Sequence, residues 1–223
     1  KTTFCSFFLA LYPLLLTPFT SKAQKADEIK SLFPGEQAVI LNQTSHYTIK
    51  VKDGEPQAES TEVQDIMYLS DNAGSFMSKY SFYHSSFHQV MNYKAYTITA
   101  SGKKAEVKDF KTTHNVSESV FYDDVKQTSF DFPSLSPGSV GHLEYTTTHS
   151  NPRLLSPHYF SRFIPVINGE LKITFPKNMS LKYLIRGNNK EQVQFSSETK
   201  KSETTYLFKV KNLAKEQNYA DAP

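Results

Sequence analysis

Hydrophobic and polar residues alternate with a period of two along most of the chain. Tyr47, Ile49 and Val51 alternate with threonine and lysine, which indicates a half-buried strand. The pattern recurs, bounded by turn residues, at Val63, Met67 and Leu69, at Tyr96 and Ile98, at Phe130 and Phe132, at Leu143 and Tyr145, at Ile173 and Phe175, at Leu181, Tyr183 and Ile185, and at Tyr206, Phe208 and Val210. Val107 and Phe110 indicate a return strand that contains an irregularity. No alternation of strands with long helices is present, so the chain is predicted to form an all-β sandwich or barrel.

Turn-forming residues separate these strands. Asp53-Gly54 and Ser101-Gly102 each follow a predicted strand. Pro137-Gly138 combines a fixed φ with a residue that is free to take a positive φ, as a type II turn requires. Gly187-Asn188-Asn189 is predicted to turn the chain towards Val193. Before the first strand, residues 26–33 are predicted to form a short helix that ends at Pro34-Gly35.

Residues 1–24 have a different, strongly apolar composition. Lys1 precedes an apolar run over residues 4–16, and Ser21-Lys22-Ala23 places small residues at the −3 and −1 positions of a cleavage site. This layout is typical of a secretory signal peptide; a buried helix or a membrane anchor is the alternative. Because the run is too short to span about 30 Å of hydrocarbon, we expect export to the periplasm or cell surface and no stable membrane span after cleavage.

Charge and cysteine content narrow the classes of function. Loss of residues 1–23, which include Lys1 and Lys22, lowers the formal net charge from +3 to about +1. The mature chain would then have no long-range attraction for nucleic acid or anionic lipid. The whole sequence has 1 cysteine, Cys5, which is lost with the leader. The mature chain would therefore contain neither a disulfide nor a cysteine nucleophile within this span. With 13 Tyr, 17 Phe and no Trp, we expect an aromatic core.

His84 and His88 form the only closely spaced histidine pair. On a helix, two histidines four residues apart can hold one metal ion, but the catalytic zinc motif requires glutamate where Ser85 stands. The neighbouring Tyr80 and Phe87 favour a strand or an aromatic loop, in which this spacing does not converge. We therefore predict no metal site at this pair.

Asp123-Asp124 is a candidate cation-binding or acid–base pair. Adjacent residues of a strand point to opposite faces, so this pair needs a third ligand from elsewhere in the fold. Asp71-Asn72-Ala73-Gly74 lacks the alternating ligands of a calcium loop and is predicted to be a turn.

Motifs for nucleophilic catalysis and nucleotide binding are absent from the sequence. Gly138-Ser139-Val140-Gly141 does not match the serine turn between a strand and a helix that hydrolases use, and no glycine-rich phosphate-binding loop is present. The sequence therefore predicts no catalytic, cofactor-binding or metal-binding residues and no cofactor.

A long run of residues resembles a known family. Residues 122–140 read YDDVKQTSFDFPSLSPGSV, followed by LEYT at 143–146 and YFSRFIPV at 159–166. Upstream, YKAYT at 93–97, SGKK at 101–104 and VKDF at 107–110 continue the likeness. These segments are similar to the domain of unknown function that stands before transglutaminase-like domains in exported Gram-negative bacterial proteins. The likeness covers roughly residues 40–210, and its motifs are turns and strand faces.

The resemblance implies an immunoglobulin-like antiparallel β-sandwich, usually followed by a cysteine-protease-like domain that uses Cys, His and Asp. That catalytic set has no counterpart in the mature chain. We therefore expect a signal peptide at 1–23, a lead-in at 24–37, a β-sandwich at 38–210 and, at 211–223, a linker to a missing downstream domain.

The expected function is that of a non-catalytic module of an exported transglutaminase-like protein. It would pack against a downstream catalytic domain of the same chain or present substrate to it, with the connection at residues 151–155 as a candidate contact. The alternative is a carbohydrate- or protein-binding module of the cell envelope, for which an exposed row of Tyr80, Tyr83 and Phe87 would be evidence. A third possibility, an enzyme that uses His84, His88 or Asp123-Asp124, requires those groups to converge.

Overall fold

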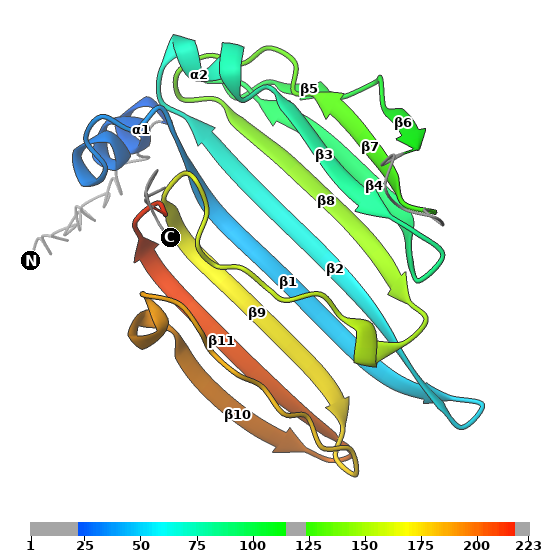
Figure 1. The fold of residues 1–223 in the computed structure, drawn as a ribbon. Coiled ribbons are helices and arrows are strands. Elements are labelled where there is room, and N and C mark those ends of the chain that lie inside the picture. The colour runs from blue at the N-terminus through cyan, green and yellow to red at the C-terminus, as the bar shows by residue number, and fades with distance from the viewer. Residues whose placement is uncertain (1–21, 115–123, 217–223) are drawn as a thin grey trace, which may run out of the picture.

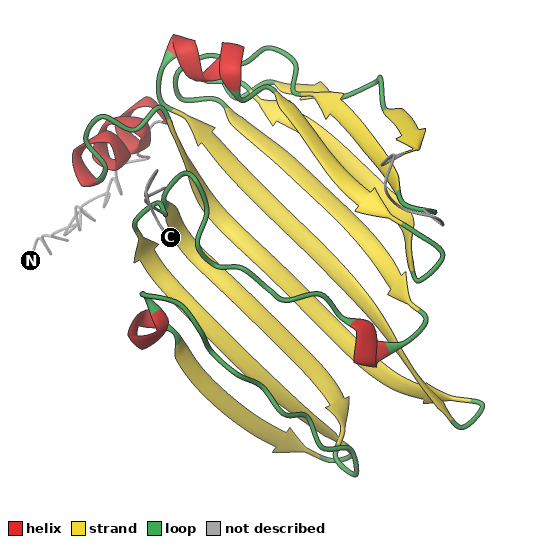
Figure 2. Cartoon of the chain, in the orientation of Figure 1, coloured by secondary structure: helices red, strands yellow, loops and turns green. Residues whose placement is uncertain are grey.

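Two β-sheets pack face to face, and helices lie only at their margins (Figures 1 and 2). The computed structural model describes residues 22–114 and 124–216. The large sheet has the order β10-β11-β9-β1-β2-β8-β4-β5, and its strands in chain order are β1 (Ala38–Lys52), β2 (Glu55–Tyr68), β4 (His88–Ile98), β5 (Lys104–Glu106), β8 (Val140–His149), β9 (Val166–Pro176), β10 (Gln194–Lys200) and β11 (Glu203–Leu213). The small sheet has the order β3-β7-β6, with β3 (Lys79–His84), β6 (Lys111–His114) and β7 (Lys126–Asp131).

The helical elements are short. Helix α1 covers Lys22–Leu32, so the helix expected at 26–33 is present and begins earlier. Helix α2 covers Asp71–Phe76 and is capped by Ser70, whose side chain accepts a hydrogen bond from the Ala73 N–H; the turn predicted at Asp71–Gly74 was therefore wrong. Single 3-10 turns are η1 (Pro152–Leu154) and η2 (Lys190–Gln192). No helix of the described residues is long and apolar enough to cross a membrane.

The all-β sandwich expected from the sequence is confirmed, with one departure from purely antiparallel pairing. Strands β1 and β9 run parallel, whereas the other strand pairs are antiparallel. Because β8 and β9 point the same way in the large sheet, residues 150–165 must run back along the sheet between them. This segment, which we call the crossover, passes over β2 and β1 in Figure 1.

Local turn chemistry is confirmed at two of the predicted positions. Asp53 and Gly54 both have positive φ, 54° and 84°, and join the paired residues Lys52 and Glu55 in the tight hairpin that such a dipeptide favours. Gly138 has φ 83°, and the Ser139 N–H donates to the Ser136 carbonyl at 2.9 Å, the geometry of a type II turn.

Two strand predictions were wrong. Residues 181–185 form no strand, although Leu181, Tyr183 and Ile185 alternate. They belong to a segment without strand pairing, residues 177–193, which ends with η2 and lies over β10 and β11 (Figure 2). Val107 and Phe110 lie between β5 and β6 instead of within a strand. At 181–185, extended backbone gives the period of two without pairing, because alternate side chains still point to the same side. At 107–110 the only backbone hydrogen bond to the large sheet among the described residues is that of the Val107 N–H, which donates to the Ala95 carbonyl of β4 at 3.0 Å.

The main core lies between the inner face of the large sheet and the small sheet. Its buried members include Ile40, Ile66 and Leu143 from the large sheet and Phe82 and Phe130 from the small one. The inner face of β8 is the one predicted from the alternation, and it buries Gly141, Leu143 and Thr147.

A second cluster joins α1 to the outer face of the large sheet. Ala26 and Ile29 of the helix pack with Val39, Leu41 and Met67. Three parts of the sequence-based predictions lie outside the described residues: positions 1–21 of the leader predicted at 1–23, Asp123, and positions 217–223 of the predicted linker.

Candidate functional site

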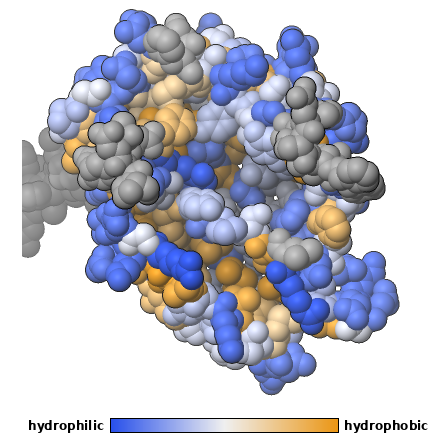
Figure 3. Space-filling model, in the orientation of Figure 1, coloured by the Kyte–Doolittle hydropathy of each residue, from blue (hydrophilic) through white to orange (hydrophobic). Residues whose placement is uncertain are grey.

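A groove of about 940 Å³ lies on the inner face of the large sheet. Leu171 and Ile173 of β9 and Phe208 and Val210 of β11 line it, together with residues 157–161 of the crossover and 183–190 of the 177–193 segment. The two irregular segments thus form walls on either side of the paired strands. In Figure 3, hydrophobic side chains gather over the lower part of this face, where β9, β10 and β11 lie in Figure 1.

Aromatic packing holds the 177–193 segment on the sheet. The Tyr183 ring lies 4.8 Å from Phe195 of β10 and 4.9 Å from Phe208 of β11, between ring centroids. Tyr183 nevertheless remains 48% exposed, and the adjacent Leu184 is 71% exposed. Across the groove, Tyr159 of the crossover is 62% exposed. Large exposed apolar side chains near a concave surface are typical of a binding site.

The crossover is attached to the sheet by polar contacts. Gln43 is buried in β1; its side-chain N–H donates to the Tyr159 carbonyl at 2.7 Å, and its side-chain oxygen accepts from Arg162 Nε at 2.9 Å. Phe160 packs against Gly169 of β9, which has no side chain to obstruct it. The crossover therefore has a defined path over the sheet, which fixes this wall of the groove.

His158 places an imidazole in the same wall. Its ring packs edge-on against Phe160, with 4.6 Å between centroids. Its Nε2 atom is buried and has no hydrogen-bond partner among the described residues. Burial, with a smaller contribution from the Arg162 charge, lowers the pKa of His158 to about 4, so the ring is neutral at pH 7.

Polar side chains also fill the inner face beneath the crossover. The Tyr145 hydroxyl donates to Glu62 at 2.9 Å. Burial raises the pKa of Glu62, while the Tyr145 hydrogen bond and the Arg162 charge oppose that shift. Burial likewise raises the pKa of Tyr80, to about 12. Since Glu62 is satisfied by its neighbours, this cluster fits a role in fixing the crossover better than a role in proton transfer.

The sequence-predicted pair His84 and His88 does not form a site. The two residues flank the turn between β3 and β4, as the strand or loop prediction required. His84 Nε2 contacts the Thr128 hydroxyl at 3.0 Å, whereas His88 Nδ1 lies 2.7 Å from His149 Nδ1. The histidine that partners His88 is therefore 61 residues away and not its neighbour in the sequence.

His149 continues this contact into the sheet. Its Nε2 atom lies 2.8 Å from the Ser60 hydroxyl, which also interacts with the Tyr47 hydroxyl. Ser60 is 0% exposed, so its oxygen cannot meet a substrate even though it lies beside an imidazole. Ser60 and His149 are thus paired as a nucleophile and its base would be. In this conformation, however, the buried Ser60 oxygen is not accessible to a substrate.

The remaining candidates are dispersed. Asp124 accepts the Ser86 backbone N–H at 2.7 Å and lies beside the turn between β3 and β4; its neighbour Asp123 lies outside the described residues. Tyr80 packs inward against Phe132, at 5.7 Å between ring centroids, whereas Tyr83 is 56% exposed. The exposed aromatic row that would indicate sugar stacking is therefore incomplete.

Residues 43–216, more than half of the 223 residues, match the family described as a domain of unknown function with a solved structure, DUF3857. The chain belongs to the DUF3857 family. The match runs from β1 to the end of β11, so it includes both walls of the groove and omits α1. No curated protein matches the chain.

One solved structure shares the fold of this DUF3857 domain, and two others superpose on it with lower scores. A putative protease from Parabacteroides distasonis superposes with a TM-score of 0.71 and 16% identity, over 84% of this chain and 38% of that protein. An M1 zinc metallopeptidase from Deinococcus radiodurans has a TM-score of 0.40, 11% identity and coverages of 78% and 39%. Yeast LTA4 hydrolase has a TM-score of 0.40, 7% identity and coverages of 80% and 29%. The DUF3857 chain thus spans well under half of each.

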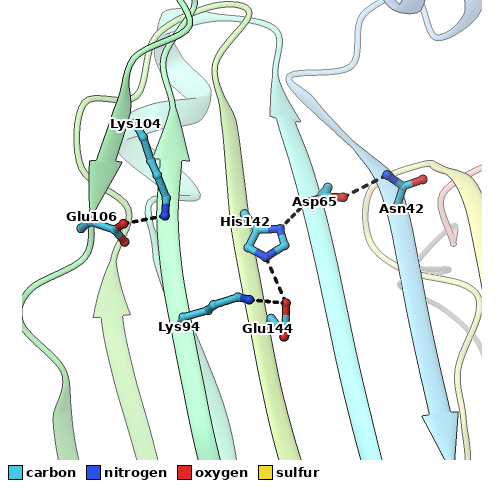
Figure 4. A network of polar contacts seen from close by, with 7 residues as sticks. All are labelled: Asn42, Asp65, Lys94, Lys104, Glu106, His142 and Glu144. Atoms are coloured by element: carbon cyan, nitrogen blue, oxygen red, sulfur yellow. Dashed lines mark hydrogen bonds and ion pairs between the residues drawn. The ribbon is translucent and has the colours of Figure 1, made fainter.

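The outer face of the DUF3857 domain carries polar contacts between adjacent strands (Figure 4). Asn42 donates to Asp65 at 2.9 Å, and the other Asp65 oxygen lies 2.7 Å from His142 Nδ1. Glu144 pairs with Lys94 at 2.8 Å, and its carboxylate lies 3.7 Å from His142 Nε2. Lys94 of β4 and Glu144 of β8 lie directly opposite each other, and opposite charges in this position stabilise a strand pair. Across residues 22–114 and 124–216, no cluster of three or more ligand side chains could hold a metal ion.

The sequence does not reveal the groove because neither wall has a pattern that is specific to a site. Residues 159–161 lie within the family resemblance, which implies no site there, and 181–185 have the period of two that is typical of a strand. The only usable signal was the concentration of proline, aromatic and histidine residues at 157–160, which is unusual for a simple connection.

Acid is expected to destabilise the DUF3857 domain through His158, whose pKa burial lowers to about 4, and through His149. Burial, and secondarily the charge of His88, lower its pKa to about 4, whereas an unfolded histidine titrates near 6.5. The unfolded state therefore binds more protons below pH 6.5, and stability is lost as the pH falls from 6.5 towards 4. Allowing for solvent screening, we expect a loss of about 1–2 kcal/mol from this residue in urea unfolding.

The variant His149→Gln should be less stable at pH 7, but its free energy of unfolding should fall less steeply as the pH is lowered. The matched control His114→Gln, at an exposed position in β6, should keep the wild-type slope. A slope for His149→Gln parallel to that of the wild type would show that another group causes the acid sensitivity.

Proposed function

We propose that this domain is a non-catalytic module of an exported, transglutaminase-like protein. In this proposal the leader at 1–23 directs export, and the domain packs against a downstream catalytic domain or presents substrate to it. Its partner would be that domain of the same chain, and neither nucleic acid nor a cofactor would take part.

One observation carries the proposal. The putative protease from Parabacteroides distasonis contains this fold at a TM-score of 0.71 but devotes only 38% of its chain to it, so most of that protein lies outside the shared fold. Membership of DUF3857 agrees with the family resemblance of residues 122–140 and 159–166. Fold alone does not determine activity, and the reactive pairs in the described part are dispersed or inaccessible, as at His84 and Ser60.

The proposal is tested first at the gene. We expect the natural reading frame to continue beyond Pro223 into a segment that supplies Cys, His and Asp in that order; a stop codon directly after Pro223 would refute it. In the complete protein, replacing that cysteine should abolish amide hydrolysis or acyl transfer, measured by amine release. Equal activity from the 223-residue chain alone would assign catalysis to this domain instead.

A further inference from the structure

The groove combines an apolar base with walls of unpaired backbone. Leu171, Ile173, Phe208 and Val210 contribute the apolar base. Among the described residues, the backbone N–H groups of 158–161 and of 183–188 donate to no other backbone group. The carbonyls of 183–188 likewise accept from no backbone group in the described part of the chain. Most of these residues are exposed, and unpaired backbone groups along an extended segment are able to pair with a second extended chain.

Two side chains add polar preferences. His158 Nε2 is a buried imidazole nitrogen without a partner in the described chain, and such atoms are usually satisfied by water or by a ligand. Three cationic side chains line the groove, of which Lys190 and Lys215 pair with Glu191 and Glu36. The third, Arg186, makes no ion pair among the described residues. One acidic side chain, Glu216, also lines the groove. The wall at 183–190 therefore offers one positive charge without an ion pair in the described chain, that of Arg186.

We propose that this groove binds an extended polypeptide segment with apolar side chains and one acidic residue at its end. The peptide backbone would pair with the segment walls, its apolar side chains would cover Leu171, Ile173 and Phe208, and its carboxylate would pair with Arg186. A volume of about 940 Å³ lies at the upper end of the range for ligand pockets. The inference rests on the proposed function, since it names the substrate class that the module would present.

The test measures binding of labelled acetyl-Val-Thr-Val-Phe-Asp-amide to the full chain by fluorescence anisotropy. We expect saturable binding that weakens about tenfold when the backbone nitrogens of the peptide are methylated, because the peptide can then no longer donate to the carbonyls of 183–188 and about two hydrogen bonds are lost. Equal affinity for the methylated peptide would overturn the proposal in favour of a non-peptide apolar ligand. Absence of saturable binding would overturn it as well.

Charge reversal provides the second arm. Arg186→Glu should weaken the acidic peptide about fivefold and favour the same peptide ending in lysine by a similar factor. The control Arg153→Glu, at an exposed position in η1, should change neither. An Arg186→Glu variant that leaves both affinities unchanged would refute the assigned site. Because no catalysis is measured, failure here is distinguishable from failure of the proposed function, which is tested by the reading frame and by amine release.

Discussion

Phe132→Ala should lower the free energy of unfolding by about 3–5 kcal/mol, the cost of removing a large aromatic ring from a packed core. Phe132 is 4% exposed and follows β7 of the small sheet. Its ring meets Phe130 at 5.0 Å and Tyr80 at 5.7 Å between centroids. It also covers Gly141 of the large sheet, where an added Cβ would lie 3.0 Å from the ring.

This contact joins the two sheets, so the loss should appear as lower cooperative stability of the whole domain. Urea unfolding followed by far-ultraviolet circular dichroism measures it. The matched control is Phe163→Ala, whose ring is 63% exposed, and its effect should stay within about 0.5–1 kcal/mol. Similar losses for the two variants would contradict the assignment of the main core.

Gly169→Ala should destabilise the domain by about 1–3 kcal/mol through overpacking. An added Cβ at this buried position in β9 would lie 2.6 Å from Val210 Cγ2 and 2.9 Å from Phe160 Cδ1. Both distances are shorter than carbon–carbon contact, so the crossover must shift. Because that shift moves the wall that carries His158, the variant should also bind the acidic apolar peptide more weakly.

A double-mutant cycle separates the crossover from the strand. In the Phe160→Ala background the added methyl group meets only Val210, so the cost of Gly169→Ala should fall, giving a coupling of about 0.5–3 kcal/mol. Equal costs in the two backgrounds, measured by urea unfolding, would show that Phe160 does not fix the crossover at Gly169.

Local structure was predictable where it depends on few residues. Asp53-Gly54 and Pro137-Gly138 specify their turns through the backbone dihedral angles that they allow, and β8 buries the predicted side of its alternation. The segment at 181–185 was not predictable in this way. Tyr183 packs on Phe195 and Phe208 from an unpaired extended backbone, and a period of two does not distinguish that arrangement from a strand.

Long-range contacts account for the rest. Nothing near His88 in the sequence indicates that its partner is His149, because that contact depends on the pairing of β4 with β8. The parallel pairing of β1 with β9 depends on a crossover whose length and path carry no sequence pattern. The groove arises from both, so the family resemblance gave its fold but not its position.

The most direct test of a module that binds polypeptide without transforming it is the fate of the bound peptide. The full chain is equilibrated with acetyl-Val-Thr-Val-Phe-Asp-amide and an excess of a primary amine. The mass of the recovered peptide is then measured by mass spectrometry. We predict saturable binding and recovery of the peptide at its original mass. A cleaved or amine-exchanged product, formed in proportion to the amount of protein, would contradict the account.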